Sequence, residues 1–251
     1  SAASDVYKRQ RKKPSVRLVE PSTVEISDEV RNWLLRRGIS QETAEHFGIY
    51  RTEKSFGDKP EGCIVFPYRV DGQLVNNKYR TKDKRFRQEG GATRSLFNID
   101  AVREYWQETG DRTVIFVEGE MDVLAMHEAG VKNVISVPNG ATLNSNNLDY
   151  LDNCIDYFED KTEVILALDT DEPGQALKQE FIRRLGAEVC YLVDFDDCKD
   201  ANEYLLNHGA DKLREVVTSC KQVHLEGVST SVSYTHLRAH ETRGNLVCRR
   251  L

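Results

Sequence analysis

The sequence TVIFVEGEMD at residues 113–122 decides the fold class, and VILALDTDEPG at residues 164–174 repeats its pattern. In each stretch, at least four consecutive apolar residues run directly into a carboxylate-rich turn. An apolar run without polar alternation is typical of a strand covered on both faces, which favours a parallel sheet. Functional groups of such sheets gather at the carboxyl ends of the strands. We therefore expect Glu118, Asp169 and Asp171 at one sheet edge.

These three carboxylates predict a site for a divalent cation. Negative charges crowded at one edge repel one another unless a cation neutralises them. Carboxylate oxygens are also the ligands that Mg²⁺ takes most readily from proteins. The sequence therefore indicates that Glu118, Asp169 and Asp171 hold Mg²⁺ or a similar ion.

The acidic residues have two other possible explanations besides a Mg²⁺ site. The spacing of residues 169–180 superficially fits a calcium-binding EF-hand loop, but Pro173 occupies a ligand position and a buried strand precedes the loop. Acidic residues in the first turn of a helix also complement its dipole. This explanation accounts for Glu120 and Glu172, but not for carboxylates that follow two different strands.

A third acidic stretch, DFDDCKDANE at residues 194–203, follows another apolar segment. Taken alone, Asp200 reads as the N-cap of a short helix. Beside the other two stretches, it becomes a candidate fourth metal ligand.

Strands and helices alternate along this half of the chain. Such alternation predicts a compact α/β domain with right-handed crossovers. Strands are expected at 113–117, 134–137, 163–168 and 188–193, and helices at about 120–129, 144–158 and 173–185.

Two short helices are expected near the beginning of the chain, with Ser27 and Ser40 as N-caps and Gly38 and Gly48 at their ends. We interpret this pair as a packing element. A hairpin follows, because Asp71-Gly72 favours a type I′ turn between two apolar runs.

The returning strand of the hairpin is basic. Alternate residues of a strand share a face, so cations at every second position are expected to line up. A solvated sheet face is the plainer interpretation, but aligned cations without interleaved acids favour phosphate binding. The aligned residues are Lys78, Arg80, Lys82 and Lys84, and Arg85, Arg87 and Arg94 extend the charge.

Composition and net charge restrict the classes of partner and compartment that fit this chain. The chain has 251 residues and a formal net charge of −6, so any nucleic-acid binding is expected to be local. No apolar run approaches the roughly 20 residues of a membrane span. The six cysteines form no CxxC pair, which argues against a zinc ribbon and favours a reducing compartment.

The acidic motifs carry a family resemblance. A Glu-Gly pair after one strand and Asp-x-Asp after another resemble the signature of the Toprim domain, found in DnaG-type primases, topoisomerases and some nucleases. With the basic stretch 78–87, Ser95-Leu96-Phe97 and residues 199–203, the sequence is similar to the primase half of phage primase–helicases and Twinkle proteins. The resemblance spans roughly residues 26–221. It implies an α/β fold in which a Toprim-like parallel sheet flanked by helices is preceded by a smaller, basic α+β subdomain.

The resemblance also implies a division of the chain. The basic primase subdomain is expected at 11–110, the Toprim domain at 111–221, and the start of a linker after residue 222. Residues 1–10 and roughly 231–251 resemble translated sequencing-adaptor read-through, so we do not expect them to belong to the fold.

Residue roles follow from the same resemblance. Glu118, Asp169 and Asp171 match catalytic, metal-binding carboxylates, and Asp200 matches a later acidic residue. Asp122 follows the family pattern but is equally well explained as structural. Nucleotide or DNA binding is expected at Lys78, Arg80, Lys82, Lys84, Arg85 and Arg87, of which Lys78 and Lys84 match residues that contact the incoming nucleotide.

The implied function is that of a DNA primase, which makes short RNA primers on single-stranded DNA by two-metal nucleotidyl transfer. Mg²⁺ or Mn²⁺ is the expected cofactor. The expected partners are single-stranded DNA template, ribonucleoside triphosphates and a fused or partner helicase, without a membrane, in the cytoplasm of a bacterial or phage-infected cell. The sequence has neither a cysteine-rich zinc module nor a GxxxxGK[ST] phosphate loop, so we expect it to be a fragment. The alternatives are a non-catalytic DNA-binding or assembly module of a Twinkle-like helicase, and a Toprim nuclease or topoisomerase fragment.

Overall fold

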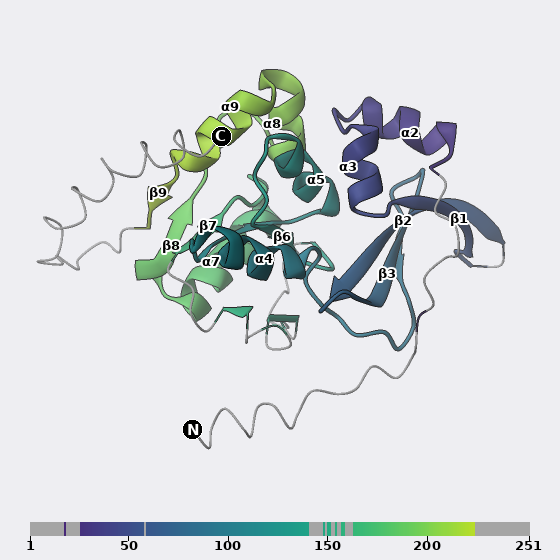
Figure 1. Cartoon of the computed structure of the whole chain (residues 1–251), viewed down its shortest axis with the longest axis horizontal. Coiled ribbons are helices and arrows are strands. Elements are labelled where there is room, and N and C mark those ends of the chain that lie inside the picture. Colours follow the sequence, from purple (N-terminus) through teal and green to yellow (C-terminus); the bar gives the residue numbers. More distant parts are fainter. Residues whose placement is uncertain are drawn as a thin grey trace, which may run out of the picture.

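The computed structural model describes residues 26–57, 59–140 and 163–223, together with Leu18, Leu148, Tyr150, Leu151, Cys154, Tyr157 and Phe158. Within this part of the chain the strands form two sheets. A four-stranded sheet lies on the right of Figure 1, and a five-stranded sheet lies on the left.

The four-stranded sheet is antiparallel, in the order β1-β2-β3-β4. Asp71 and Gly72, which join β2 to β3, have φ angles of 53° and 73°. Both are positive, as a type I′ turn requires, so the predicted hairpin is confirmed. The strands are β1 (Tyr50–Ser55), β2 (Pro60–Val70), β3 (Gln73–Thr81) and β4 (Phe86–Gln88).

The predicted line of four cations on one strand face is wrong. Strand β3 ends at Thr81, and Lys82 and Lys84 lie in the turn before β4. The turn is closed by backbone hydrogen bonds, in which Lys84 N–H donates to Thr81 O and Thr81 N–H donates to Arg85 O. The chain therefore reverses two residues after Arg80, and period-two alignment stops there.

The five-stranded sheet has the order β6-β5-β7-β8-β9, and only the short edge strand β9 runs antiparallel to its neighbour. All residues of the interior strand β5 are buried. The predicted parallel sheet is thus confirmed. Its strands are β5 (Thr113–Val117), β6 (Val134–Ser136), β7 (Glu163–Leu166), β8 (Cys190–Leu192) and β9 (Lys221–Gln222).

Helices cover both faces of this sheet. On one face, Ile115 and Val117 pack in a core cluster with residues of α5, α8 and α9. On the other face, Val114 and Phe116 pack with residues of α4 and α7. The alternate sides of β5 are therefore both apolar, which is why its sequence shows no polar alternation. These helices are α4 (Ile99–Thr109), α5 (Glu120–Glu128), α7 (Glu172–Leu185), α8 (Ala201–His208) and α9 (Ala210–Thr218), and a 3₁₀ turn, η2 (Ala187–Val189), precedes β8.

The two N-terminal helices join the sheets. Helices α2 (Asp28–Leu35) and α3 (Gln41–His46) begin at the predicted caps Ser27 and Ser40, whose hydroxyls accept backbone hydrogen bonds. Their apolar residues share one core cluster with Phe66 of β2 and Val123 of α5. The pair is thus a packing element, as expected. It holds the four-stranded sheet, which we call the basic sheet because β3 carries Lys78 and Arg80, against the parallel sheet.

The helix expected near 144–158 falls largely outside the described residues, although Tyr150 and Leu151 are helical. Among the helices that the structure does describe, no segment has both the length and the apolar character needed to cross a membrane.

Candidate metal centre

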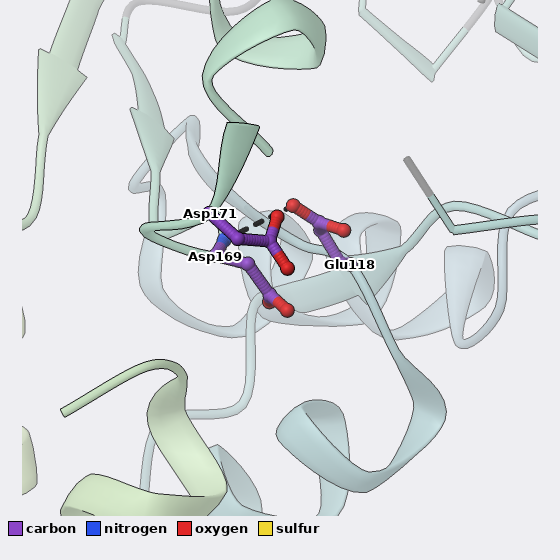
Figure 2. A group of neighbouring side chains, drawn as sticks. All are labelled: Glu118, Asp169 and Asp171. Atoms are coloured by element: carbon purple, nitrogen blue, oxygen red, sulfur yellow. Dashed lines mark hydrogen bonds between the residues drawn. The ribbon is translucent and has the colours of Figure 1, made fainter. Parts of the chain in front are cut away.

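The structure brings Glu118, Asp169 and Asp171 together at one edge of the parallel sheet. Glu118 directly follows β5, and the two aspartates follow β7, which pairs with β5. One carboxylate oxygen from each residue lies within 4.8 Å of the others. Figure 2 shows the carboxylate of Glu118 facing those of the two aspartates from the neighbouring strand. The parallel pairing of β5 and β7 therefore creates the cluster.

Backbone contacts hold the cluster in shape. Asp169 N–H donates to Glu118 Oε1 over 3.1 Å, the dashed line in Figure 2. Asp171 is the N-cap of α7, and its side chain accepts a hydrogen bond from Gly174 N–H at 3.0 Å. A Cβ on Gly174 would overlap the backbone oxygen of Asp169 and Oε1 of Glu118. Only glycine therefore lets the start of α7 approach the carboxylates this closely.

A lysine supplies positive charge to the cluster. Lys199 Nζ lies 3.0 Å from Oδ2 of Asp169 and 3.0 Å from Oδ2 of Asp171. Hydrogen bonds to these two carboxylates raise the pKa of Lys199. Lys199 belongs to the third acidic stretch, but the sequence does not reveal this role. Only folding brings its ammonium into contact with the side chains of Asp169 and Asp171.

The two aspartates of the cluster differ in their electrostatics. Burial raises the pKa of Asp169, and Lys199 only partly opposes this effect. Burial acts in the same direction on Asp171, but the hydrogen bond from Gly174 N–H and the Lys199 ammonium outweigh it and lower its pKa. Asp169 therefore loses its proton less readily than an exposed aspartate, and it lies beside two other acids. A divalent cation bound there would stabilise the ionised form of these carboxylates.

Asp122 and Asp200 lie beside the three carboxylates rather than among them. Asp122 is buried and accepts a hydrogen bond from Asn202 N–H at 3.1 Å. Burial, followed by the charges of Asp200 and Asp169, raises the pKa of Asp122. Asp200 is the N-cap of α8 and accepts from Glu203 N–H at 2.8 Å. The capping role that the sequence allowed for Asp200 is thus present, and within the described residues Asp200 is not part of the close group.

The basic sheet brings one lysine to the same region. Lys78 is buried, and its Nζ lies 2.7 Å from Oε1 of Glu120. The hydroxyl of Tyr68 donates to the same oxygen. Glu120 opens helix α5, two residues after Glu118. This buried ion pair therefore ties the hairpin to the helix that starts beside the three clustered carboxylates.

The remaining predicted cations occupy different surroundings. Arg80 is buried, with Cζ 4.6 Å from the ring centroid of Trp33. Burial, then the charge of Arg37, lowers the pKa of Arg80. The other four side chains are exposed: Lys82 and Lys84 in the turn, Arg85 paired with Glu61, and Arg87 donating to the backbone oxygen of Ser55.

A cavity of about 820 Å³ lies between the two sheets. Lys78, Phe86 and Arg87 line it from the basic sheet. Glu118 and Asp169 line it from the parallel sheet, together with other residues that include Lys199. Of the basic residues predicted to bind phosphate, Lys78, Arg87 and Arg94 thus contribute to its wall. Sequence reasoning missed Phe86, although an aromatic residue between Arg85 and Arg87 was a usable signal.

Comparison with known proteins identifies the domain that carries these carboxylates. A family model described as Toprim-like matches residues 115–205, from β5 into α8. The chain carries a Toprim-like domain. All three clustered carboxylates fall inside this domain, and the fold class expected from the sequence is confirmed.

Among proteins with such a domain, the chain is similar to relatives named as primases or Twinkle proteins. A Primase homolog protein of Arabidopsis thaliana is 37% identical over 213 residues, covering 78% of this chain and 60% of that protein. A Twinkle homolog protein of the same plant, named chloroplastic/mitochondrial, is 34% identical over 90% of this chain and 33% of its own length. The primase fragment of the bacteriophage T7 primase-helicase protein is 27% identical, with a TM-score of 0.56 and coverage of 83% of each chain.

The chain thus resembles Toprim primases of the phage primase–helicase and Twinkle type, as its motifs indicated. It spans no more than 60% of the two plant relatives. The division at residues 11–110, 111–221 and 222–251 stays a prediction.

Proposed function

We propose that this chain is the primase region of a longer replication protein and joins ribonucleotides on single-stranded DNA. The observation that carries the proposal is the convergence of Glu118, Asp169 and Asp171 on the edge of a cavity whose opposite wall is basic. Acidic groups that hold divalent cations beside a phosphate-binding wall are the machinery of nucleotidyl transfer.

Glu118, Asp169 and Asp171 would hold Mg²⁺ or Mn²⁺, with Asp200 and Asp122 contributing negative charge from the side. The donor set suits these ions, because it offers only carboxylate oxygens. When bound, such ions lower the pKa of a hydroxyl nucleophile and neutralise charge on the leaving phosphates.

The reaction itself requires no nucleophilic side chain. The primer 3′-hydroxyl gives up its proton to water, and its oxygen forms a bond to the α-phosphorus of the incoming triphosphate. The bond between this phosphorus and the oxygen that bridges to the β-phosphate breaks and releases pyrophosphate. The chain's own contribution is to hold both reactants in line within a cavity. Lys78 and Lys84, with their basic neighbours, would hold the triphosphate and the template backbone. Lys78 and Arg87 lie in the cavity wall, and Lys82 and Lys84 lie in the exposed turn.

The names of the relatives support the choice of partners. One relative, from Enterobacteria phage T3, is named a DNA helicase/primase. We infer that a helicase, fused to this chain or separate from it, supplies the single-stranded template. A place in the cytoplasm of a bacterial or phage-infected cell belongs to the same proposal, although the name of the Twinkle relative assigns that protein to plant organelles.

The test is extension of a short RNA primer already annealed to a DNA template, with labelled ribonucleotides and Mg²⁺ or Mn²⁺. Starting from an annealed primer removes any need for a separate template-recognition module. We expect the wild-type chain to extend the primer and Asp169→Asn to lose extension while keeping the wild-type circular dichroism spectrum. Equal extension by both proteins would remove Asp169 from the proposed centre.

A second candidate function is a non-catalytic DNA-binding or assembly module, with which the 34% identity to the Twinkle homolog is compatible. Binding of single-stranded DNA without primer extension, also after the flanking segments of the gene are restored, would establish this module instead. Nicked or relaxed plasmid without new oligoribonucleotides would point to a nuclease or topoisomerase.

A further inference from the structure

Phe86 is an exposed aromatic residue in the wall of the cavity. It is the first residue of β4 and is 54% exposed. Among the described residues, Leu35 and Leu206 are the other large apolar side chains with such exposure, and neither lines the cavity. The exposed ring therefore faces the same space as the carboxylates of the metal centre.

Two cations border this ring. Lys78 Nζ lies 5.2 Å from the ring centroid of Phe86, and Arg80 Cζ lies 5.9 Å from it. The strand register explains the arrangement, because Arg80 of β3 pairs directly with Phe86 of β4. Arg80 also lies over Trp33, so aromatic and cationic groups alternate from α2 to the cavity.

This combination selects one class of ligand. A purely apolar partner would not use the cationic side chains of the same wall, Lys78 and the exposed Arg87, and a bare phosphate would not use the exposed ring. A nucleotide satisfies both groups, since its base stacks on aromatic rings and its phosphates pair with lysine and arginine. The position fits as well, because a base on Phe86 would leave its phosphates in the cavity that holds Glu118 and Asp169.

We propose that Phe86 is a stacking platform for a nucleobase at the entrance to the metal centre. The proposal rests on the proposed function and deepens it, by naming the side chain that receives the base. The base belongs either to the incoming ribonucleotide or to the single-stranded template, and both present the same stacked ring and phosphate.

Binding measurements with two probes separate these sources. Fluorescence anisotropy would follow a short labelled oligodeoxythymidylate, and a fluorescent ATP analogue with Mg²⁺ would report the nucleotide. Loss of one aromatic stacking contact weakens binding roughly 5- to 150-fold. We expect Phe86→Ala to lose affinity in this range for at least one probe, and Phe86→Trp to keep wild-type affinity. Loss for the oligonucleotide alone assigns the template base, and loss for ATP alone assigns the incoming base.

Two controls isolate stacking. Leu35→Ala removes an equally exposed apolar side chain away from the cavity and should bind both probes like the wild type. An abasic oligonucleotide of equal length keeps the phosphates, so Phe86→Ala should bind it as the wild type does. Unchanged binding of both probes by Phe86→Ala, an equal loss for the abasic strand or in Leu35→Ala, or no rescue by Phe86→Trp would overturn the proposal.

The outcome is independent of catalysis. If the wild-type chain fails to extend primers while the Phe86 variants behave as expected, the polymerase assignment fails and the stacking site stands. If primers are extended and Phe86→Ala binds both probes normally, the stacking site fails and the polymerase assignment stands.

Discussion

Replacement of Lys199 by methionine should strengthen metal binding. The ammonium of Lys199 lies 3.0 Å from an oxygen of each of Asp169 and Asp171, two of the three residues proposed to hold the ion. An ammonium and a divalent cation cannot occupy the same oxygens together, so the lysine competes with the metal. Methionine keeps a long apolar stem but has no charge, and the variant therefore removes the competition.

The magnitude follows from the exposure of the pair. The Lys199 side chain is 52% exposed, so each ion pair is screened by solvent and contributes about 0.2–1 kcal/mol. Two such pairs give about 0.4–2 kcal/mol. Since about 1.4 kcal/mol corresponds to a factor of ten, we expect the Mn²⁺ affinity of Lys199→Met to rise roughly 2- to 30-fold.

Isothermal titration calorimetry with Mn²⁺, without nucleotide or DNA, measures this difference. The matched control is Lys212→Met, because Lys212 also forms an ion pair, with Glu215 on α9, and is outside the metal centre. The control should bind Mn²⁺ like the wild type. Unchanged or weaker binding by Lys199→Met would refute the reasoning and make Lys199 a structural support of the carboxylates.

Three further predictions concern stability. Gly174→Ala forces a Cβ into oxygens of the metal centre and should cost about 1–3 kcal/mol in urea unfolding, whereas Gly90→Ala, in open space, should be nearly neutral. Lys78→Met leaves the charge of buried Glu120 without a counter-ion and should cost about 3–5 kcal/mol, much of which Glu120→Gln should restore in the double variant. Burial raises the pKa of Asp122, so the folded chain binds its proton more tightly than the unfolded chain does. Without metal, the wild type should therefore lose stability relative to Asp122→Asn as pH rises above the ordinary pKa of an aspartate.

Each of these has an outcome that contradicts it. Equal unfolding midpoints for the two glycine variants would mean that α7 moves away from the carboxylates at little cost. A Lys78→Met variant as stable as the wild type would show that Glu120 reaches solvent or another donor. A constant stability difference between wild type and Asp122→Asn across this pH range would contradict the raised pKa.

The sequence predicted those features that depend on neighbours in the chain or on strand periodicity. The apolar run of β5, the Asp71-Gly72 turn and the caps Ser27 and Ser40 are local signals, and the structure contains all of them. The convergence of Glu118 with Asp169 followed from a general property of parallel sheets.

The end of β3 after Thr81 was missed for a local reason, because period-two counting continued through the turn that hydrogen bonds between Thr81 and Arg85 close. Other features depend on contacts between distant segments. The ammonium of Lys199 reaches the aspartates only after a crossover between strands β7 and β8. The exposure of Phe86 likewise depends on how the two sheets face each other across the cavity.

The central claim is that carboxylates following two adjacent strands bind a divalent ion. A crystal of the chain soaked in MnCl₂, with data collected to record the anomalous signal of manganese, tests it most directly. The account predicts an anomalous peak within coordination distance of carboxylate oxygens from Glu118, Asp169 and Asp171, with Lys199 displaced. Lys199 still paired with both aspartates, and no peak between the three carboxylates, would contradict it.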